Sequence, residues 1–153
     1  MRWSFTLLLS LMCLVASAAA AETTGRVIKV LPQYLDLEGR NSTTPSLYDR
    51  DAYQAFLRTH PDQRSGLQFC VQWKAHDVSG PLKLRVEARG SVLGDKGKPL
   101  TWEVAVTRKG WFSQWTKLEV TGDAYKELGD LIAWRATLWD GDRLLGEQKS
   151  YLW

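Results

Sequence analysis

The segment from Leu67 to Ala75 constrains the fold most strongly, because its side chains alternate strictly between apolar and polar. Successive side chains of an extended strand point to opposite faces, so this segment has one apolar face and one polar face. The apolar face consists of Leu67, Phe69, Val71, Trp73 and Ala75. Aromatic and β-branched residues suit a half-buried sheet surface. The segment therefore predicts a central β-strand with one face in a hydrophobic core.

Further segments with the same alternation follow along the chain, at 82–89, 100–107, 116–120 and 132–138. The last of them leads through Asp140-Gly141-Asp142 into a returning strand. We predict a three-residue turn here, because it pairs Leu138 with Leu144 and places Arg135 opposite Glu147. Regularly spaced strands with turns between them are typical of an antiparallel β-sandwich.

The chain before the central strand adds other elements. Pro32 interrupts an apolar stretch, which predicts an edge strand at 26–31 and a second extended piece at 33–37. Residues 46–59 predict an amphipathic helix capped by Ser46, with Ala52, Tyr53, Phe56 and Leu57 on its buried face. A short helix at 123–128, capped by Asp123, is expected to end at Gly129. The predicted fold class is mainly β, a sandwich with one extra helix before its second core strand.

The N-terminus has the pattern of a secretory signal peptide. Arg2 precedes the apolar run Phe5–Val15, and small residues fill 16–21. Cleavage after Ala20 or Ala21 is predicted, with Cys13 as a lipoprotein site the lesser alternative. We expect residues 22–64 to form an edge strand, a loop and a helix, and residues 65–153 to form the sandwich core. Together they are expected to be one domain. The signal peptide predicts that the protein is exported and is periplasmic or extracellular.

The charge and the cysteine content bear on which kinds of partner the protein binds and on whether it forms disulfides. Cleavage after Ala21 leaves 19 basic and 17 acidic residues, which are interspersed and form no basic stripe of the kind that binds nucleic acid. The apolar run Phe5–Val15 is too short to span a membrane, and no second apolar stretch approaches that length. Cys70 becomes the sole cysteine and is either a small residue covered by the helix or a thiol for an intermolecular disulfide or redox reaction. Asn41 starts an N-glycosylation pattern that matters in a eukaryotic source alone.

From about residue 65 onward the chain resembles a fibronectin type III or immunoglobulin-like domain. The resemblance rests on the strand 67–73, which ends in Trp73, on 84–89, and on Leu128 followed six residues later by Trp134. Trp134 stands where that family has a tyrosine, so the tyrosine-corner hydrogen bond is not expected. The resemblance implies a spacer, adhesion or binding module rather than an enzyme, and it does not imply a ligand.

Aromatic residues are the main candidates for a binding surface. Trp111, Phe112 and Trp115 lie in a connection beside Arg108 and Lys109, and Trp139 is expected to point outward. The simpler interpretation is that Trp111 and Trp115 close the open end of the sandwich. The alternative is that Trp111, Phe112, Trp115 and Trp139 form an exposed surface for a ligand or partner.

No pattern in the sequence predicts a catalytic residue, a metal site or a cofactor. Cys70 and His76 are too far apart along a straight strand to act as nucleophile and base, and Asp140-Gly141-Asp142 matches turn chemistry rather than a calcium loop. We therefore expect a non-catalytic protein-interaction or structural module of the cell envelope or extracellular space. A carbohydrate-binding module is the first alternative, and a small cysteine-dependent enzyme or redox protein is the second.

Overall fold

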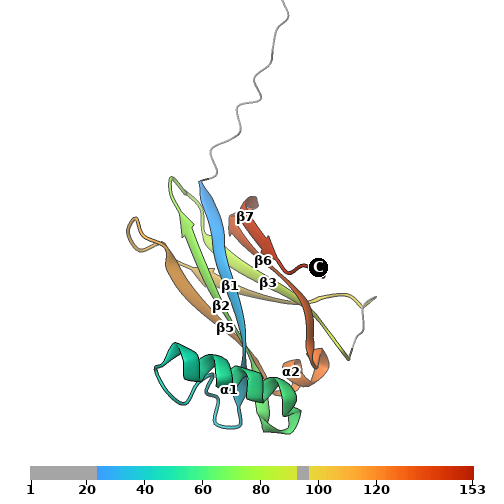
Figure 1. The fold of residues 1–153 in the computed structure, drawn as a ribbon. Helices are drawn as coiled ribbons and strands as arrows, with labels where there is room; N and C mark the ends of the chain where they lie inside the picture. The colour runs from blue at the N-terminus through green and yellow to red at the C-terminus, as the bar shows by residue number, and fades with distance from the viewer. Residues whose placement is uncertain (1–23, 93–96) are drawn as a thin grey trace, which may run out of the picture.

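The computed structural model describes residues 24–92 and 97–153; the predicted signal peptide, including Cys13, lies outside the described residues. The described chain forms two antiparallel sheets that face each other (Figure 1). One sheet has the order β1-β2-β5, formed by Gly25–Asp36, Arg64–Ala75 and Gln114–Thr121. The other has the order β4-β3-β6-β7, formed by Leu100–Val106, Leu82–Gly90, Leu131–Asp140 and Arg143–Lys149. This arrangement confirms the predicted immunoglobulin-like sandwich.

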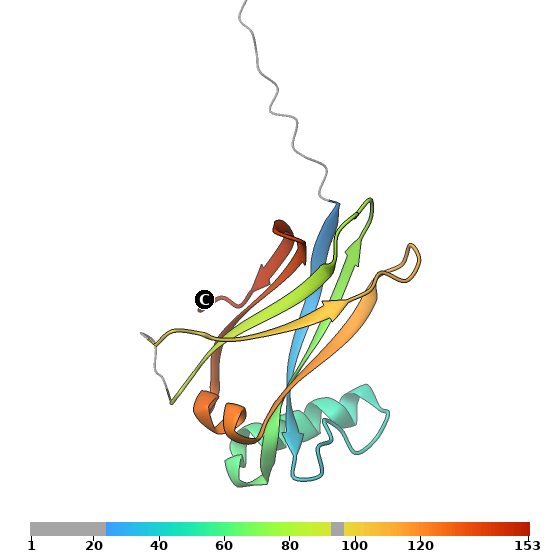
Figure 2. The same ribbon diagram turned by 180° about the vertical axis from the view of Figure 1, so that it is seen from behind.

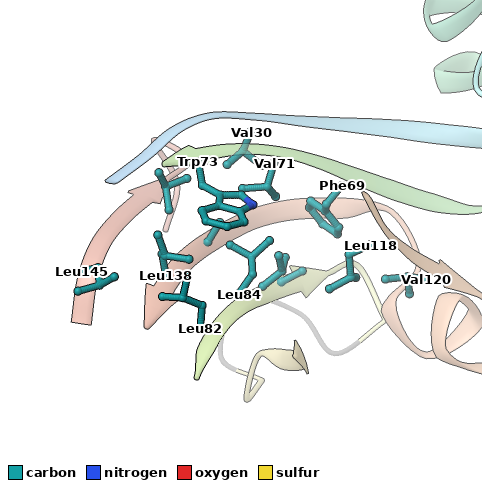
Figure 3. Packing of buried hydrophobic residues seen from close by; sticks show 14 of the residues in the cluster. Val30, Phe69, Val71, Trp73, Leu82, Leu84, Leu118, Val120, Leu138 and Leu145 are labelled. Carbon is teal, nitrogen blue, oxygen red and sulfur yellow. The ribbon is translucent and has the colours of Figure 1, made fainter. Parts of the chain in front are cut away.

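The core lies between the two sheets and is centred on β2, as the alternation predicted. Leu67, Phe69, Val71 and Trp73 are each at most 1% exposed. Figure 3 shows Phe69, Val71 and Trp73 facing Leu84 and Leu138 of the opposite sheet. The indole N–H of Trp73 donates to the Thr116 hydroxyl at 2.8 Å, so its one polar atom is satisfied inside the core.

The first strand is longer than predicted. Instead of two pieces separated by Pro32, β1 runs unbroken from Gly25 to Asp36, and Pro32 pairs with Phe69. A proline is tolerated there because β1 is the edge of its sheet, where a missing N–H on the outer side costs no ladder hydrogen bond. As a result Leu31 pairs with Cys70 and Gln33 pairs with Gln68. All four side chains lie on the outer face of the sheet.

The predicted helix is α1, Leu47–Thr59, and Ser46 caps it by accepting the Asp49 N–H. Leu57 is buried as predicted, but Gln54 is buried too, while Ala52 is exposed and Phe56 is 43% exposed. The Gln54 amide accepts from the Tyr34 N–H at 2.8 Å and donates to the carbonyls of Tyr34 and Asn41. A polar side chain therefore ties the helix to the end of β1. A 3₁₀ turn, Pro61–Gln63, follows α1.

Two local predictions at the C-terminal half are wrong. The hairpin has a two-residue turn, Gly141-Asp142, because Asp140 pairs with Arg143 and Trp139 pairs with Leu144. A register shift at Leu145 then places Leu138 opposite Gly146, so the apolar face stays in register without a three-residue turn. The short helix α2, Gly122–Leu128, has Thr121 rather than Asp123 at its N-cap. Gly129, with φ of 70°, ends it as expected.

The sandwich has two different ends and two different sides. Figures 1 and 2 show both helices at one end, and the β4–β5 connection together with the start of β1 at the other. On one side β1 packs closely on β7, where a Cβ on Gly146 would lie 2.6 Å from the Arg26 Cα. On the other side the inward-facing residues of β4 are half-buried, including Trp102 and Val106. The sandwich is therefore open along β4 and β5.

Candidate functional site

The β4–β5 connection, residues 107–113, carries two of the predicted site residues and is called the aromatic loop below. Trp111 is 89% exposed and Phe112 is 86% exposed at its tip. The interpretation that Trp111 closes the open end of the sandwich is therefore wrong. Gly110, with φ of 73°, supplies the left-handed residue that turns the chain just before the tip.

Trp115 lies on the outer face of the three-stranded sheet, next to Gln72 of β2. It is 50% exposed, so it does not close the sandwich either. Trp115 lines two cavities. One, of about 500 Å³, lies between β4 and β5 and is also lined by Trp73, Val106 and Thr116. The other, of about 280 Å³, extends across the outer face of the sheet to Leu31, Cys70 and Arg50.

A groove continues from Trp115 onto α1. The outer-face cavity adjoins a third cavity of about 300 Å³, and the two share Leu31, Gln33 and Arg50. We call the joined cavities the α1 groove; its walls are formed by Trp115 and Lys117 of β5, Leu31 and Gln33 of β1, and Arg50 and Arg58 of α1. The groove therefore crosses one face of the sheet and reaches the helix.

The α1 groove is mixed in polarity and mainly basic. Arg50, Arg58 and Lys117 line it, and so does the acidic Asp51, which lies 3.3 Å from the guanidinium of Arg50. Leu31 and the indole of Trp115 supply apolar surface. An occupant that carries a carboxylate next to an apolar side chain would match this wall.

Cys70 lies under the groove, on the outer face of the sheet, and is 9% exposed. Its sulfur accepts from the Gln68 amide at 2.9 Å and lies 3.6 Å from the Gln33 side-chain oxygen. Burial raises the pKa of the Cys70 thiol, which the nearby Gln68 and Lys117 only partly oppose. A reactive thiol needs the opposite shift, so the geometry favours the structural interpretation of Cys70.

Trp139 is separated from the other three aromatic residues, because it lies on the outer face of the four-stranded sheet. Its indole N–H donates to the Thr137 hydroxyl at 2.9 Å, and the Arg85 guanidinium stacks 5.1 Å from the ring centroid. Arg85 in turn bonds Glu103 at 2.6 Å. The structure thus places Trp139 in a network of charged side chains and does not join it to the aromatic loop.

The acidic turn Asp140-Gly141-Asp142 has structural partners. The Asp140 carboxylate accepts from the Gly80 N–H at 2.7 Å and from Arg143 at 3.1 Å. The bond from Gly80 fastens the β2–β3 turn to the β6–β7 hairpin, and the bond from Arg143 lies within that hairpin. Across residues 24–92 and 97–153 there is no group of three or more His, Cys, Asp or Glu side chains placed to hold a metal ion.

The groove residues of β1 and α1 were missed by the sequence analysis. Leu31 and Gln33 would have been placed on the outer face if β1 had been taken as one strand through Pro32. Arg50 lines the groove because α1 folds back over the sheet, and no local pattern specifies that return. Asn41, the candidate glycosylation residue, donates its amide N–H to Gln33 at 2.7 Å beside the groove.

Comparisons with known proteins give a limited result. No protein-family profile matches this chain, and no curated protein matches it. Among solved structures, the chain is similar to an immunoglobulin-like protein from Pseudomonas aeruginosa, with 18% sequence identity and a TM-score of 0.40. The similarity covers 84% of this chain and 96% of that one.

No helix in the described part of the chain combines the length and the apolar content that crossing a bilayer requires.

Proposed function

We propose that this chain is an exported, non-catalytic interaction module whose partner is a protein segment bound in the α1 groove. One observation carries the proposal: two cavities that share Leu31, Gln33 and Arg50 together extend from Trp115 on the sheet to Arg58 on the helix. A surface that crosses two elements in this way offers a peptide or a protein edge more contact than a single exposed aromatic ring does.

The chemistry of the groove suggests what kind of segment binds. Arg50, Arg58 and Lys117 favour a partner with acidic side chains, and the half-exposed Trp115 offers an aromatic anchor at one end. The buried thiol supports a role without cysteine chemistry, because its raised pKa leaves little thiolate at neutral pH.

Photo-crosslinking of the mature protein tests the proposal. A photoreactive amino acid replaces Lys117, which is exposed and lines the groove, and in a control it replaces Lys149, which is exposed on β7 of the other sheet. The expected result is one protein adduct from an envelope extract with the probe at 117 and none at 149. Binding of the identified partner should then weaken at least about tenfold in Trp115→Ala. Equal labelling at both positions would contradict the proposal.

A carbohydrate ligand is the second candidate, because the exposed rings of Trp111 and Trp115 could each stack on a sugar. The measurement is tryptophan emission during titration with envelope polysaccharides. A shift that disappears in Trp111→Ala/Trp115→Ala, with no crosslinked protein at position 117, would favour this candidate.

Export is tested separately: N-terminal sequencing of the protein from the cell envelope should begin at Ala21 or Glu22.

A further inference from the structure

The tip of the aromatic loop exposes more apolar surface than any structural role explains. Trp111 and Phe112 are neighbours in sequence, and each is more than four-fifths exposed, at 89% and 86%. Large aromatic side chains are normally buried or kept for binding, and adjacent fully exposed rings mark a contact surface.

The base of the loop is held in place while the tip projects. The Ser113 hydroxyl accepts from the Gln72 amide at 2.9 Å. The Gln114 amide, turned so that its nitrogen faces the Thr107 carbonyl at 3.0 Å, accepts the Lys109 N–H at 2.7 Å. These bonds fix both ends of the loop, so the rings are presented on a short, anchored projection rather than on a loose segment.

The charge around the loop is basic, and the opposite end of the molecule is acidic. Arg108 and Lys109 directly precede the tip and are exposed. At this end, residues 24–26, 74–83, 105–115 and 139–144 together carry six basic and three acidic side chains. The two helix-bearing connections at the other end, 35–65 and 120–132, carry five basic and eight acidic side chains. The molecule therefore has a positive pole, and the aromatic tip belongs to it.

We propose that the aromatic loop is an interfacial membrane anchor, which places Trp111 and Phe112 among the headgroups of an anionic bilayer while Arg108 and Lys109 contact lipid phosphates. Tryptophan is enriched at the membrane–water interface because its ring is apolar and its N–H is polar. Basic residues next to such rings add attraction to anionic lipid. The loop touches the bilayer surface and does not cross it.

Two features favour a bilayer over a protein partner at the loop: the projecting shape of its tip, and the position of the start of β1. A protein partner that buries aromatic hot spots needs a complementary pocket around each ring, whereas a bilayer accepts a projecting tip without one. β1 begins at the same end of the sandwich (Figures 1 and 2). The apolar run 5–15 is therefore connected, in the uncleaved chain, to the end that carries the loop.

Vesicle sedimentation of the mature protein tests the proposal. The probes are vesicles of phosphatidylcholine with about one quarter phosphatidylglycerol, and vesicles of phosphatidylcholine alone. We expect binding to the anionic vesicles that weakens at high salt. Trp111→Ser/Phe112→Ser should lower the partition coefficient at least about tenfold. Arg108→Glu/Lys109→Glu should lower it at least about 25-fold, and on anionic vesicles only, since each of the two basic residues contributes about fivefold.

The matched control is Tyr48→Ser, because Tyr48 is 83% exposed on α1 at the acidic end of the molecule. Its partition coefficient should stay within about twofold of wild type. The four loop residues are exposed, so both double variants should keep the wild-type unfolding midpoint. The proposal is overturned if anionic vesicles at millimolar lipid fail to sediment the protein, or if Tyr48→Ser weakens binding as much as the loop variants do. These outcomes are independent of crosslinking at position 117, so this proposal and the groove can fail separately.

Discussion

Arg64 joins three parts of the molecule through one buried guanidinium. Its side chain is 3% exposed, donates to the carbonyls of Leu57 and Arg58 at the end of α1, and pairs with Asp130. The guanidinium also stacks on the Tyr34 ring, 4.0 Å from its centroid. The last carbonyls of a helix have no partner within the helix, so a cation placed there satisfies them and offsets the negative end of the helix dipole.

Arg64→Ala should lower the free energy of unfolding by about 3 kcal/mol, because the Arg58 carbonyl loses its donor, the Leu57 carbonyl keeps only the long bond from the His60 N–H at 3.4 Å, and the Asp130 carboxylate loses its partner. Urea unfolding followed by tryptophan fluorescence measures the change. Arg58→Ala, which removes an exposed side chain from the same helix turn, is the control and should cost less than about 0.5 kcal/mol. Equal losses in the two variants would mean that Arg64 contributes no more than an ordinary surface arginine.

Asp36 should make the free energy of unfolding fall at acidic pH. Burial alone would raise its pKa, but hydrogen bonds from the Arg40 N–H, the Tyr53 hydroxyl, the Arg40 guanidinium and the Glu38 N–H together lower it below the usual range. A carboxyl with a lowered pKa stabilises the fold above its unfolded pKa of about 3.9, and this contribution is lost as the pH falls below that value. Asp36→Asn should therefore cost about 1 to 2 kcal/mol at neutral pH and much less near pH 3. Asp123→Asn, at a fully exposed position, should show no such difference.

Cys70 should make the free energy of unfolding fall at alkaline pH. Its pKa is raised by burial, so the folded state holds the thiol proton more tightly than the unfolded state does. The stabilisation is present below the ordinary thiol pKa of about 8.5 and is lost as the pH rises beyond it. Ellman's reagent should react with the native protein at least about tenfold more slowly than with the urea-unfolded protein. Cys70→Ala should remove the loss of stability at high pH. Rapid labelling of the native thiol would show that Cys70 is accessible and would revive the redox hypothesis.

At the scale of elements, the sequence was sufficient where a single strand or helix decides the outcome. The alternation through Trp73 identified the core face of β2, and Ser46 identified the start of α1. Errors arose where a neighbouring element decides. Pro32 continues β1 because the strand lies at a sheet edge, and Gln54 is buried because the end of β1 offers it a carbonyl and an N–H.

The candidate site also combines features that the local sequence predicts with features that neighbouring elements decide. The exposure of Trp111 depends on how far the β4–β5 connection projects, and local alternation does not specify that distance. The α1 groove depends on the return of the helix over the sheet, which brings Arg50 within the same cavity as Cys70. Contacts between residues that are distant in sequence therefore separate the predicted aromatic residues and create a groove that no local pattern indicated.

The contact between β3 and α2 requires a residue without a side chain at position 90. A Cβ on Gly90 would lie 1.8 Å from the Leu128 carbonyl oxygen, which belongs to backbone and cannot rotate away. Gly90→Ala should therefore push α2 from the sheet and cost about 2 to 3 kcal/mol, measured by thermal or urea unfolding. Thr101→Ala, on the exposed face of β4, is the control and should cost less than about 0.5 kcal/mol. A Gly90→Ala protein as stable as that control would show that α2 tolerates displacement.

At the scale of the whole molecule, the N-terminal part and the sandwich are built as one unit. β1 pairs with β2 over its full length, and Gln54 and Arg64 tie α1 to β1 and to the β5–β6 connection. Val27 and Val30 of β1 pack in the same hydrophobic cluster as Val71 of β2, so the N-terminal segment shares the core of the sandwich. This connectivity predicts a single cooperative transition for residues 22–153.

Unfolding of the mature protein in urea tests that prediction with two probes. Far-UV circular dichroism reports the helices and strands together, and tryptophan fluorescence reports the seven tryptophans of the mature chain, among them Trp73 between the sheets. The two curves should coincide in wild type. Gln54→Ala removes the bonds that hold α1 to β1 and should lower the free energy of unfolding by about 2 kcal/mol, because the half-buried Tyr34 and Asn41 backbone groups lose their partner. If α1 were instead an independent appendage, the helix signal would be lost at lower urea than the fluorescence change, and the division between residues 22–64 and 65–153 would be a true domain boundary.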